Sequence, residues 1–124
     1  MLKKYVLLAV SIFWTLVIII LSLIVIEDTI SYIQVPNKDK IVHFLFYFVF
    51  VSLWYSYFRE TNNKVNLGWY VFFTAALLGI VIELCQMFFT TTRHADSKDV
   101  LANTVGALLG LLFISVTNKI ISKK

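Results

Sequence analysis

Glu83 and Gln86 interrupt a long apolar stretch in the second half of the sequence. On a helix, Glu83 would lie about six residues, or about 9 Å, inside the end of this stretch. An ionised carboxylate without a partner in lipid costs about 2.5–3.5 kcal/mol on insertion scales. We therefore expect Glu83 to face protein or water, where its carboxylate could act as a general base.

A second polar group lies at the start of an aromatic stretch. Asp39 and His43 are four residues apart and so share one face of a helix, with Lys40 beside them. A histidine in a membrane helix often only hydrogen-bonds to a neighbour, but a protonated His43 would also donate to an anionic ligand.

A third group leads into the last apolar stretch. Asp99, Asn103, Gly106 and Gly110 recur at intervals of four, three and four residues and therefore stack on one helix face. Gly106 and Gly110 form a GxxxG pair, which lets two helix backbones approach closely. We interpret these glycines as packing residues.

Helix capping offers a structural explanation for several of the acids. Asp96 precedes the last apolar stretch as an N-cap would, and Asp99 follows three residues later as in a capping box. Asn37 could cap the helix that begins near Asp39, which would then lie in the first turn, where the helix dipole favours an anion.

Considered together, these polar residues favour a binding pocket at one membrane surface, because they gather at the same ends of three stretches. Arg93 and His43 add donors that suit a phosphate or a carboxylate. Candidates for a catalytic role are His43, Glu83 and Arg93. The predicted ligand-binding residues are Asp39, Lys40, His43, Glu83, Gln86, Arg93, Asp96, Asp99 and Asn103.

The composition indicates that lipid is the main solvent of the elements that position these residues. The 124 residues are 60% hydrophobic and 15% charged, and the mean hydropathy is +0.85, whereas soluble domains are about 25% charged. We predict a single domain over residues 1–124, an all-α integral membrane four-helix bundle. The expected spans are about 5–26, 41–58, 67–89 and 100–117.

The basic residues in the connections predict the orientation of these spans. Lys3, Lys4, Arg59, Lys64, Lys119, Lys123 and Lys124 fall on one side, and Lys38, Lys40, Arg93 and Lys98 on the other. The positive-inside rule then places both termini in the cytoplasm and the predicted pocket on the outer face.

Several partners and chemistries are not expected. No solvated basic face is available for nucleic acid. Cys85 is the only cysteine, so neither an intrachain disulfide nor a Cys/His zinc pattern is possible. The sequence has no HExxH, GxSxG or P-loop signature. We expect no cofactor and no resident metal, contact with the lipid bilayer, and possible homodimerisation.

Three motifs resemble those of the VanZ-like family of small bacterial membrane proteins, which is named for a member associated with teicoplanin resistance. They read Asp39-Lys40-x-x-His43-Phe44-x-x-Tyr47, Glu83-x-x-Gln86, and Arg93-x-x-Asp96-x-x-Asp99-x-x-x-Asn103-x-x-Gly106-x-x-x-Gly110. The resemblance covers the second to fourth stretches. It implies a multi-pass protein of the bacterial cytoplasmic membrane, with a cell-envelope role and altered sensitivity to glycopeptide antibiotics.

Three functions remain open. The pocket could bind an anionic lipid headgroup or a cell-wall precursor through Arg93, Lys40 and His43. It could instead be the site of an intramembrane enzyme for a lipid-linked phosphate or ester, with Glu83 or His43 as general base, Arg93 stabilising negative charge, and a divalent metal as a variant. A third hypothesis is a proton-coupled small transporter that uses Glu83.

Overall fold

The computed structural model describes residues 2–24, 37–61, 66–90 and 95–123, and this part of the chain is helical. The helices are α1 (Leu2–Leu23), α3 (Lys38–Thr61), α4 (Leu67–Phe89) and α5 (Ser97–Ser122). Each is long and apolar enough to cross a bilayer. The structure therefore confirms the all-helical architecture with four candidate membrane spans.

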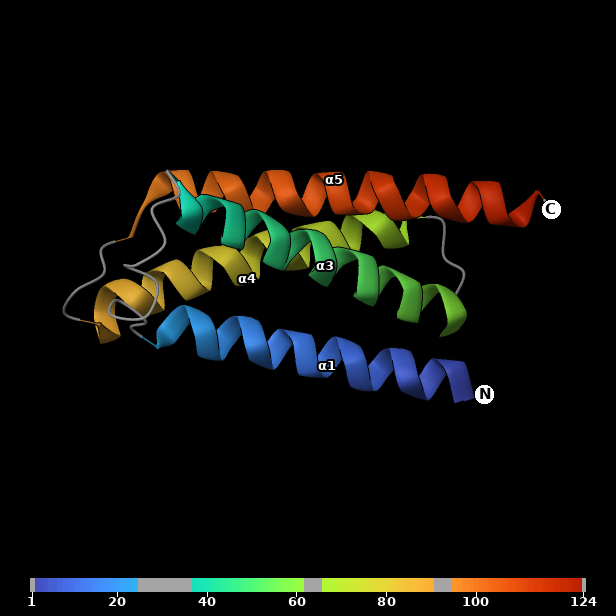
Figure 1. Cartoon of the computed structure of the whole chain (residues 1–124), viewed down its shortest axis with the longest axis horizontal. Coiled ribbons are helices and arrows are strands. Elements are labelled where there is room, and N and C mark those ends of the chain that lie inside the picture. Colours follow the sequence, from blue (N-terminus) through green and yellow to red (C-terminus); the bar gives the residue numbers. More distant parts are fainter. Residues whose placement is uncertain (1, 25–36, 62–65, 91–94, 124) are drawn as a thin grey trace.

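The helices lie side by side along the long axis, with both termini at the same end (Figure 1). Helix α3 lies against α5, and α1 packs on α3 and α4 but not on α5 within the described residues. The opposite end of the bundle therefore holds the beginnings of α3 and α5 and the end of α4. Which end faces the cytoplasm stays a prediction.

Glycines on α5 allow α3 and α5 to approach closely. A Cβ atom at Gly106 would overlap the carbonyl oxygen of Phe44, and one at Gly110 would lie 2.5 Å from the carbonyl oxygen of Phe48. Because both obstacles are backbone atoms, only glycine fits at these positions. The interpretation of the GxxxG pair as a packing motif is confirmed.

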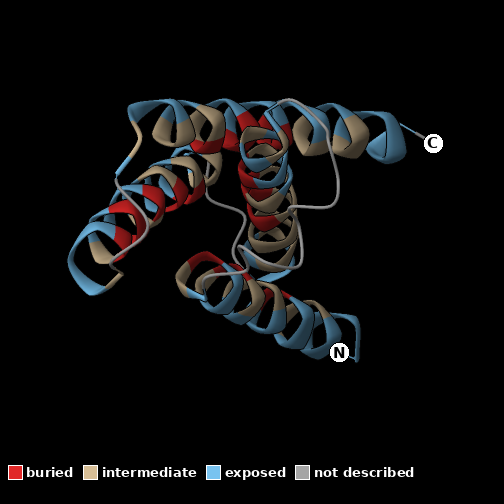
Figure 2. Cartoon of the chain, turned by 60° about the vertical axis from the view of Figure 1, so that its left-hand side comes forward, coloured by how far each residue is buried: buried red, intermediate tan, exposed pale blue. Residues whose placement is uncertain are grey.

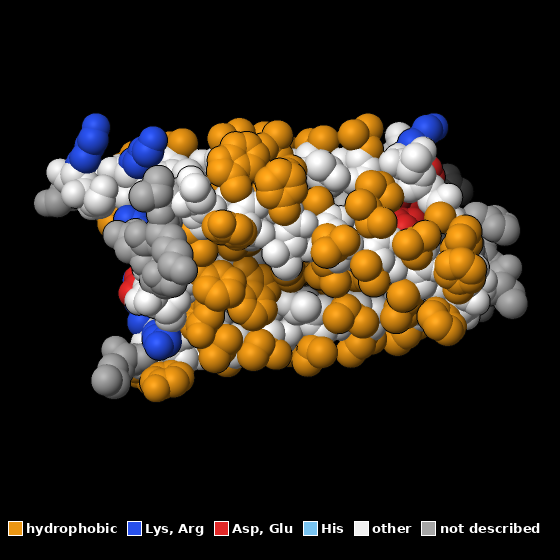
Figure 3. All heavy atoms as spheres, turned by 180° about the vertical axis from the view of Figure 1, so that it is seen from behind, with side chains coloured by type: hydrophobic (Ala, Val, Ile, Leu, Met, Phe, Trp, Pro, Cys, Tyr) orange, Lys and Arg blue, Asp and Glu red, His pale blue; other side chains and the backbone are white. Residues whose placement is uncertain are grey.

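The bundle has a thin core and an apolar outer surface. Buried residues lie on the helix faces that point toward one another (Figure 2). On the face shown in Figure 3, hydrophobic side chains cover the middle of the surface, and Lys and Arg lie toward its ends. Such a large apolar surface is unusual for a protein in water and suits a protein surrounded by lipid.

Polar groups between the helices mostly find partners within the protein. Ser11 donates to the carbonyl of Leu7 at 2.7 Å, one turn back in the same helix. The indole N–H of Trp54 donates to Thr15 Oγ1 at 3.0 Å, which joins α3 to α1. These hydrogen bonds replace those that water would otherwise supply.

The observed bounds follow the predicted spans with differences at the ends. Helix α4 has the predicted limits, and α1 begins three residues before the predicted span 5–26, whose last two residues lie outside the described part. Helices α3 and α5 extend beyond 41–58 and 100–117 at both ends. Hydropathy marks the part of a helix that meets lipid, whereas the helix itself continues into its polar ends.

Candidate functional site

Six of the nine predicted ligand-binding residues form one polar network at the end of the bundle away from the termini. Helix α3 supplies two of them, α4 supplies one, and the start of α5 with its cap supplies three. The six are Lys40, His43, Glu83, Asp96, Asp99 and Asn103.

His43 is held between two residues of α5 and is only 7% exposed. Its Nδ1 lies 3.0 Å from Asn103 Oδ1, and its Nε2 lies 3.8 Å from Asp99 Oδ2. Because an amide oxygen can only accept, Nδ1 carries a proton and donates to Asn103. In a neutral imidazole, Nε2 then presents a lone pair toward the carboxylates.

Glu83 is 2% exposed, and its two carboxylate oxygens differ in their hydrogen bonding. Oε2 accepts a hydrogen bond of 3.3 Å from the backbone N–H of Asp96, which fixes the start of α5 to α4. Oε1 is buried and has no hydrogen-bond partner in the described structure. Ligand atoms of His43, Glu83 and Asp99 all lie within 4.8 Å of one another.

Lys40 links the other two carboxylates of the network. Its Nζ lies 3.3 Å from Asp96 Oδ2 and 3.3 Å from Asp99 Oδ1. Asp96 Oδ1 also accepts from the backbone N–H of Lys98 at 2.9 Å, which confirms Asp96 as the N-cap of α5. The N–H of Lys98, together with the Lys40 ammonium, holds the pKa of Asp96 below its ordinary value.

The predicted capping box does not form. A capping box would direct the Asp99 side chain back to the N–H of Asp96. Instead Asp99 faces Lys40 and His43, and the N–H of Asp96 donates to Glu83. Tertiary contacts with α3 and α4 therefore replace the local interaction that the spacing predicted.

Of the remaining three predicted residues, two do not enter the network and one is not described. Asp39 is exposed in the first turn of α3. Gln86 is buried, but its Nε2 donates to the carbonyl of Ser22 at 2.6 Å, so it joins α4 to α1. Arg93 lies outside the described residues.

Tyr47 belongs to this region but was absent from the predicted set. It is 1% exposed, and its hydroxyl has no hydrogen-bond partner in the described part of the chain. It lies one helical turn after His43 on the same face of α3, within electrostatic range of Glu83. Its place at the end of the first motif, four residues after His43, was the signal that could have added it to the set.

Gly79 makes room for Asn103. A Cβ atom at Gly79 would lie 3.0 Å from Asn103 Nδ2, so a side chain there would press on the amide that holds His43. The small residue on α4 thereby allows α5 to bring Asn103 into the core, where it is 1% exposed.

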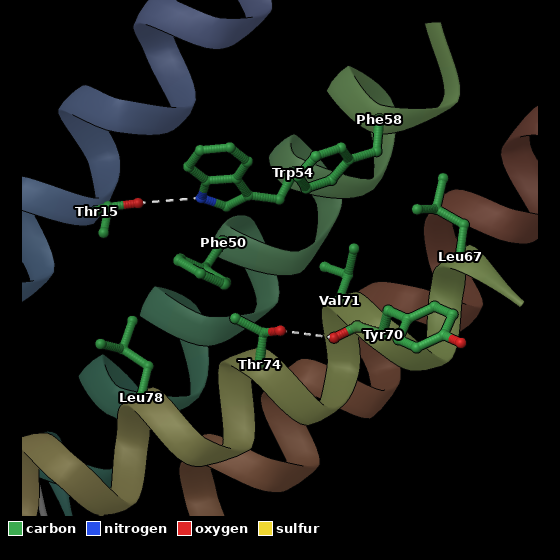
Figure 4. Close-up of a pocket in the computed structure, with 9 residues that line it drawn as sticks. All are labelled: Thr15, Phe50, Trp54, Phe58, Leu67, Tyr70, Val71, Thr74 and Leu78. Carbon is green, nitrogen blue, oxygen red and sulfur yellow. Dashed lines mark hydrogen bonds between the residues drawn. The ribbon is translucent and has the colours of Figure 1, made fainter. Parts of the chain in front are cut away.

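The bundle also has a separate cavity of about 710 Å³ between α1, α3 and α4, in the half nearer the termini (Figure 4). Its lining contains no charged side chain among the described residues. The lining residues are Thr15, Phe50, Trp54, Phe58, Leu67, Tyr70, Val71, Thr74 and Leu78. This apolar cavity is not part of the polar network.

The network holds more acids than bases. Among the residues that the structure describes, Glu83, Asp96 and Asp99 face one permanent cation, Lys40, and a histidine. An excess of negative charge in a poorly hydrated place is costly unless a cation or protons offset it. The arrangement can therefore bind a cation directly. It can bind an anion only if additional positive charge offsets the excess of carboxylates.

The comparisons with known proteins agree with the motifs. A family model described as VanZ/LLP1 matches residues 5–118. The matched range includes most of the first helix, which the motifs did not cover. No curated protein and no solved structure matches the chain significantly.

Proposed function

Since the chain belongs to the VanZ/LLP1 family, we propose that it is a bacterial cell-envelope membrane protein that binds the phosphate-bearing headgroup of an anionic lipid or lipid-linked cell-wall precursor. The binding site is the polar network at the beginnings of α3 and α5. Both termini are cytoplasmic in this proposal, so the network opens toward the outer surface of the cytoplasmic membrane.

The observation that carries the proposal is the position of the network at one end of a bundle whose sides are apolar. At that end of a membrane-spanning helix, the neighbouring molecules are lipid headgroups rather than acyl chains. A headgroup that diffuses along the membrane surface would reach these side chains without entering the hydrocarbon core.

Lys40 is the donor that we assign to the headgroup. Its side chain is 30% exposed, and two of its three N–H groups are accounted for by Asp96 and Asp99. The third has no partner among the described residues and is the one that we assign to a phosphate oxygen. The two aspartates hold the ammonium in place, so little side-chain entropy is lost when the ligand binds.

Binding of a lipid-linked wall precursor would change how accessible that precursor is to glycopeptide antibiotics. We therefore propose that the level of this protein modulates sensitivity to teicoplanin-type compounds. This effect depends on headgroup binding and should disappear with it.

A lipid titration tests the proposal. The purified protein in an uncharged detergent is titrated with phosphatidylglycerol and, separately, with zwitterionic phosphatidylcholine. Lys40→Gln should weaken phosphatidylglycerol binding about tenfold, which corresponds to ~1.4 kcal/mol and to one hydrogen bond to a charged group. The matched control is Lys98→Gln, which removes the same charge from the exposed first turn of α5 and should leave binding within about twofold.

Equal weakening by both substitutions would indicate attraction by net charge alone and would contradict a specific site. Binding of phosphatidylcholine as tight as that of phosphatidylglycerol would do the same. In cells that produce equal amounts of each variant, the teicoplanin susceptibility should change with Lys40→Gln and not with Lys98→Gln.

A further inference from the structure

We infer that His43, Glu83 and Asp99 bind a divalent transition-metal ion, which supplies the positive charge that a phosphate needs in this acidic network. This departs from the sequence-based expectation of no resident metal. The ion's role toward a phosphate rests on the proposed function, whereas binding of the ion itself does not.

The three side chains are close to the geometry of a metal site. Their ligand atoms lie within 4.8 Å of one another, and His43 Nε2 and Asp99 Oδ2 are 3.8 Å apart. Bonds of about 2.0–2.2 Å to one ion require ligand atoms about 3–3.5 Å apart. Side-chain movements of about 1 Å would therefore complete the site without moving the helices.

A buried oxygen without a partner points independently to a ligand. Glu83 Oε1 is enclosed by protein and accepts no hydrogen bond within the described structure. Burial of a carboxylate oxygen without a donor costs free energy that the protein would not otherwise recover. A cation bound to Oε1 would remove this cost.

In each of the three residues, one atom interacts with a residue outside the proposed metal site, and a second atom is left to bind the ion. Asn103 accepts from His43 Nδ1, which leaves the lone pair on Nε2. The backbone N–H of Asp96 holds Glu83 Oε2, which leaves Oε1. Lys40 holds Asp99 Oδ1, which leaves Oδ2. Outer partners of this kind orient the ligands of protein metal sites.

The donor set indicates the class of ion. One imidazole nitrogen with two carboxylate oxygens suits Zn²⁺, Mn²⁺ or Fe²⁺ better than Mg²⁺ or Ca²⁺, which prefer oxygen throughout. A charge of +2 offsets the two carboxylates that bind it. Three protein ligands leave at least one coordination position, which a phosphate oxygen could occupy.

The competing explanation is a protonated His43. An imidazolium would donate from Nε2 to Asp99 and would reduce the negative charge without any ion. The two explanations differ in a measurable way, since only the first predicts retention of a metal by the purified protein.

Metal analysis of the full chain in detergent tests the inference. The protein is stripped with a chelator, loaded with Zn²⁺ or Co²⁺, and passed over a desalting column. We expect about one ion per chain and, with Co²⁺, visible absorption bands from the nitrogen and oxygen ligands. His43→Gln and Glu83→Gln should each weaken retention by about tenfold or more.

Asp39→Asn is the matched control, because it removes an exposed carboxylate from the same end of α3 and should retain the ion. Asn103→Ala leaves all three ligands in place and should weaken Co²⁺ binding about 10–100-fold by releasing the ring of His43. Helicity and elution volume verify that each variant is folded.

The inference is overturned if the folded parent retains no more metal than folded Glu83→Gln, or if Co²⁺ gives no ligand bands. Phosphatidylglycerol binding by metal-free protein, lost in Lys40→Gln, would then leave the proposed function standing alone. Conversely, metal retention without lipid binding would leave the metal site standing and contradict the proposed function.

Discussion

At the scale of single residues, Gln86 has a structural role that can be measured apart from the polar network. Because α1 ends at Leu23, the carbonyl of Ser22 lies in the last turn of its helix. The Nε2 of Gln86 donates to this carbonyl at 2.6 Å and joins α4 to α1. Gln86→Leu should therefore lower the free energy of unfolding in detergent by about 1 kcal/mol, a typical value for a hydrogen bond between membrane helices.

Circular dichroism during denaturation with sodium dodecyl sulfate measures this loss. Met87→Leu is the control, because the neighbouring side chain is exposed on the lipid side of α4 and should change stability little. An unchanged stability of Gln86→Leu would mean that the carbonyl of Ser22 finds another donor. Retention of a metal by this variant would confirm that Gln86 stands outside the network.

The sequence identified most residues of the network, but not their partners. Spacings of three and four residues placed His43, Glu83 and Asn103 on inward faces, and all three are buried. Spacing within one helix says nothing about which turn of a neighbouring helix lies opposite. For this reason the contacts of Asp99 with Lys40 and of Gln86 with Ser22 could not be predicted.

At the scale of the helices, the contact between α3 and α5 depends on two glycines. Gly106→Ala would force α5 away from the backbone of α3, because its Cβ would overlap the carbonyl oxygen of Phe44. Overpacking of this kind costs about 1–3 kcal/mol. We expect Gly106→Ala to lower the denaturant midpoint and to weaken metal retention, since Asn103 on α5 would move away from His43 on α3.

Gly68→Ala is the control for this prediction. A Cβ at Gly68 would meet Cδ1 of Leu111 at 2.8 Å, but that atom is the end of a side chain and can rotate away. Alanine also favours a helix more than glycine does. We therefore expect Gly68→Ala to be nearly neutral, and equal effects of the two substitutions would contradict the special closeness of α3 and α5.

The number and approximate positions of the helices could be predicted because apolar stretches and polar connections alternate clearly. The first and last residues of α4 coincide with the limits of the apolar stretch 67–89. Helix α5 begins at Ser97, as the predicted N-cap at Asp96 implies, and so starts in a polar segment three residues before the predicted span. The apolar cavity between α1, α3 and α4 could not be predicted, since it depends on how three helices splay.

At the scale of the whole molecule, both termini lie at one end of the bundle, and the charge distribution predicts which side of the membrane this end faces. The termini, the end of α3 and the beginning of α4 lie at one end of the bundle (Figure 1). Seven of the 11 Lys and Arg residues belong to this end in the sequence. Because cytoplasmic connections are enriched in Lys and Arg, we expect this end to face the cytoplasm.

Reporter fusions to the full chain in a bacterial inner membrane test the orientation. A green fluorescent protein fused after Lys124 should fluoresce, and alkaline phosphatase at the same position should be inactive, because that enzyme needs the oxidising exterior. Alkaline phosphatase inserted within residues 27–36, between α1 and α3, should be active. The reversed pattern would place the network of His43, Glu83 and Asp99 at the cytoplasmic surface, where an outer-leaflet precursor could not reach it and cytoplasmic phosphate-bearing lipids would be its ligands.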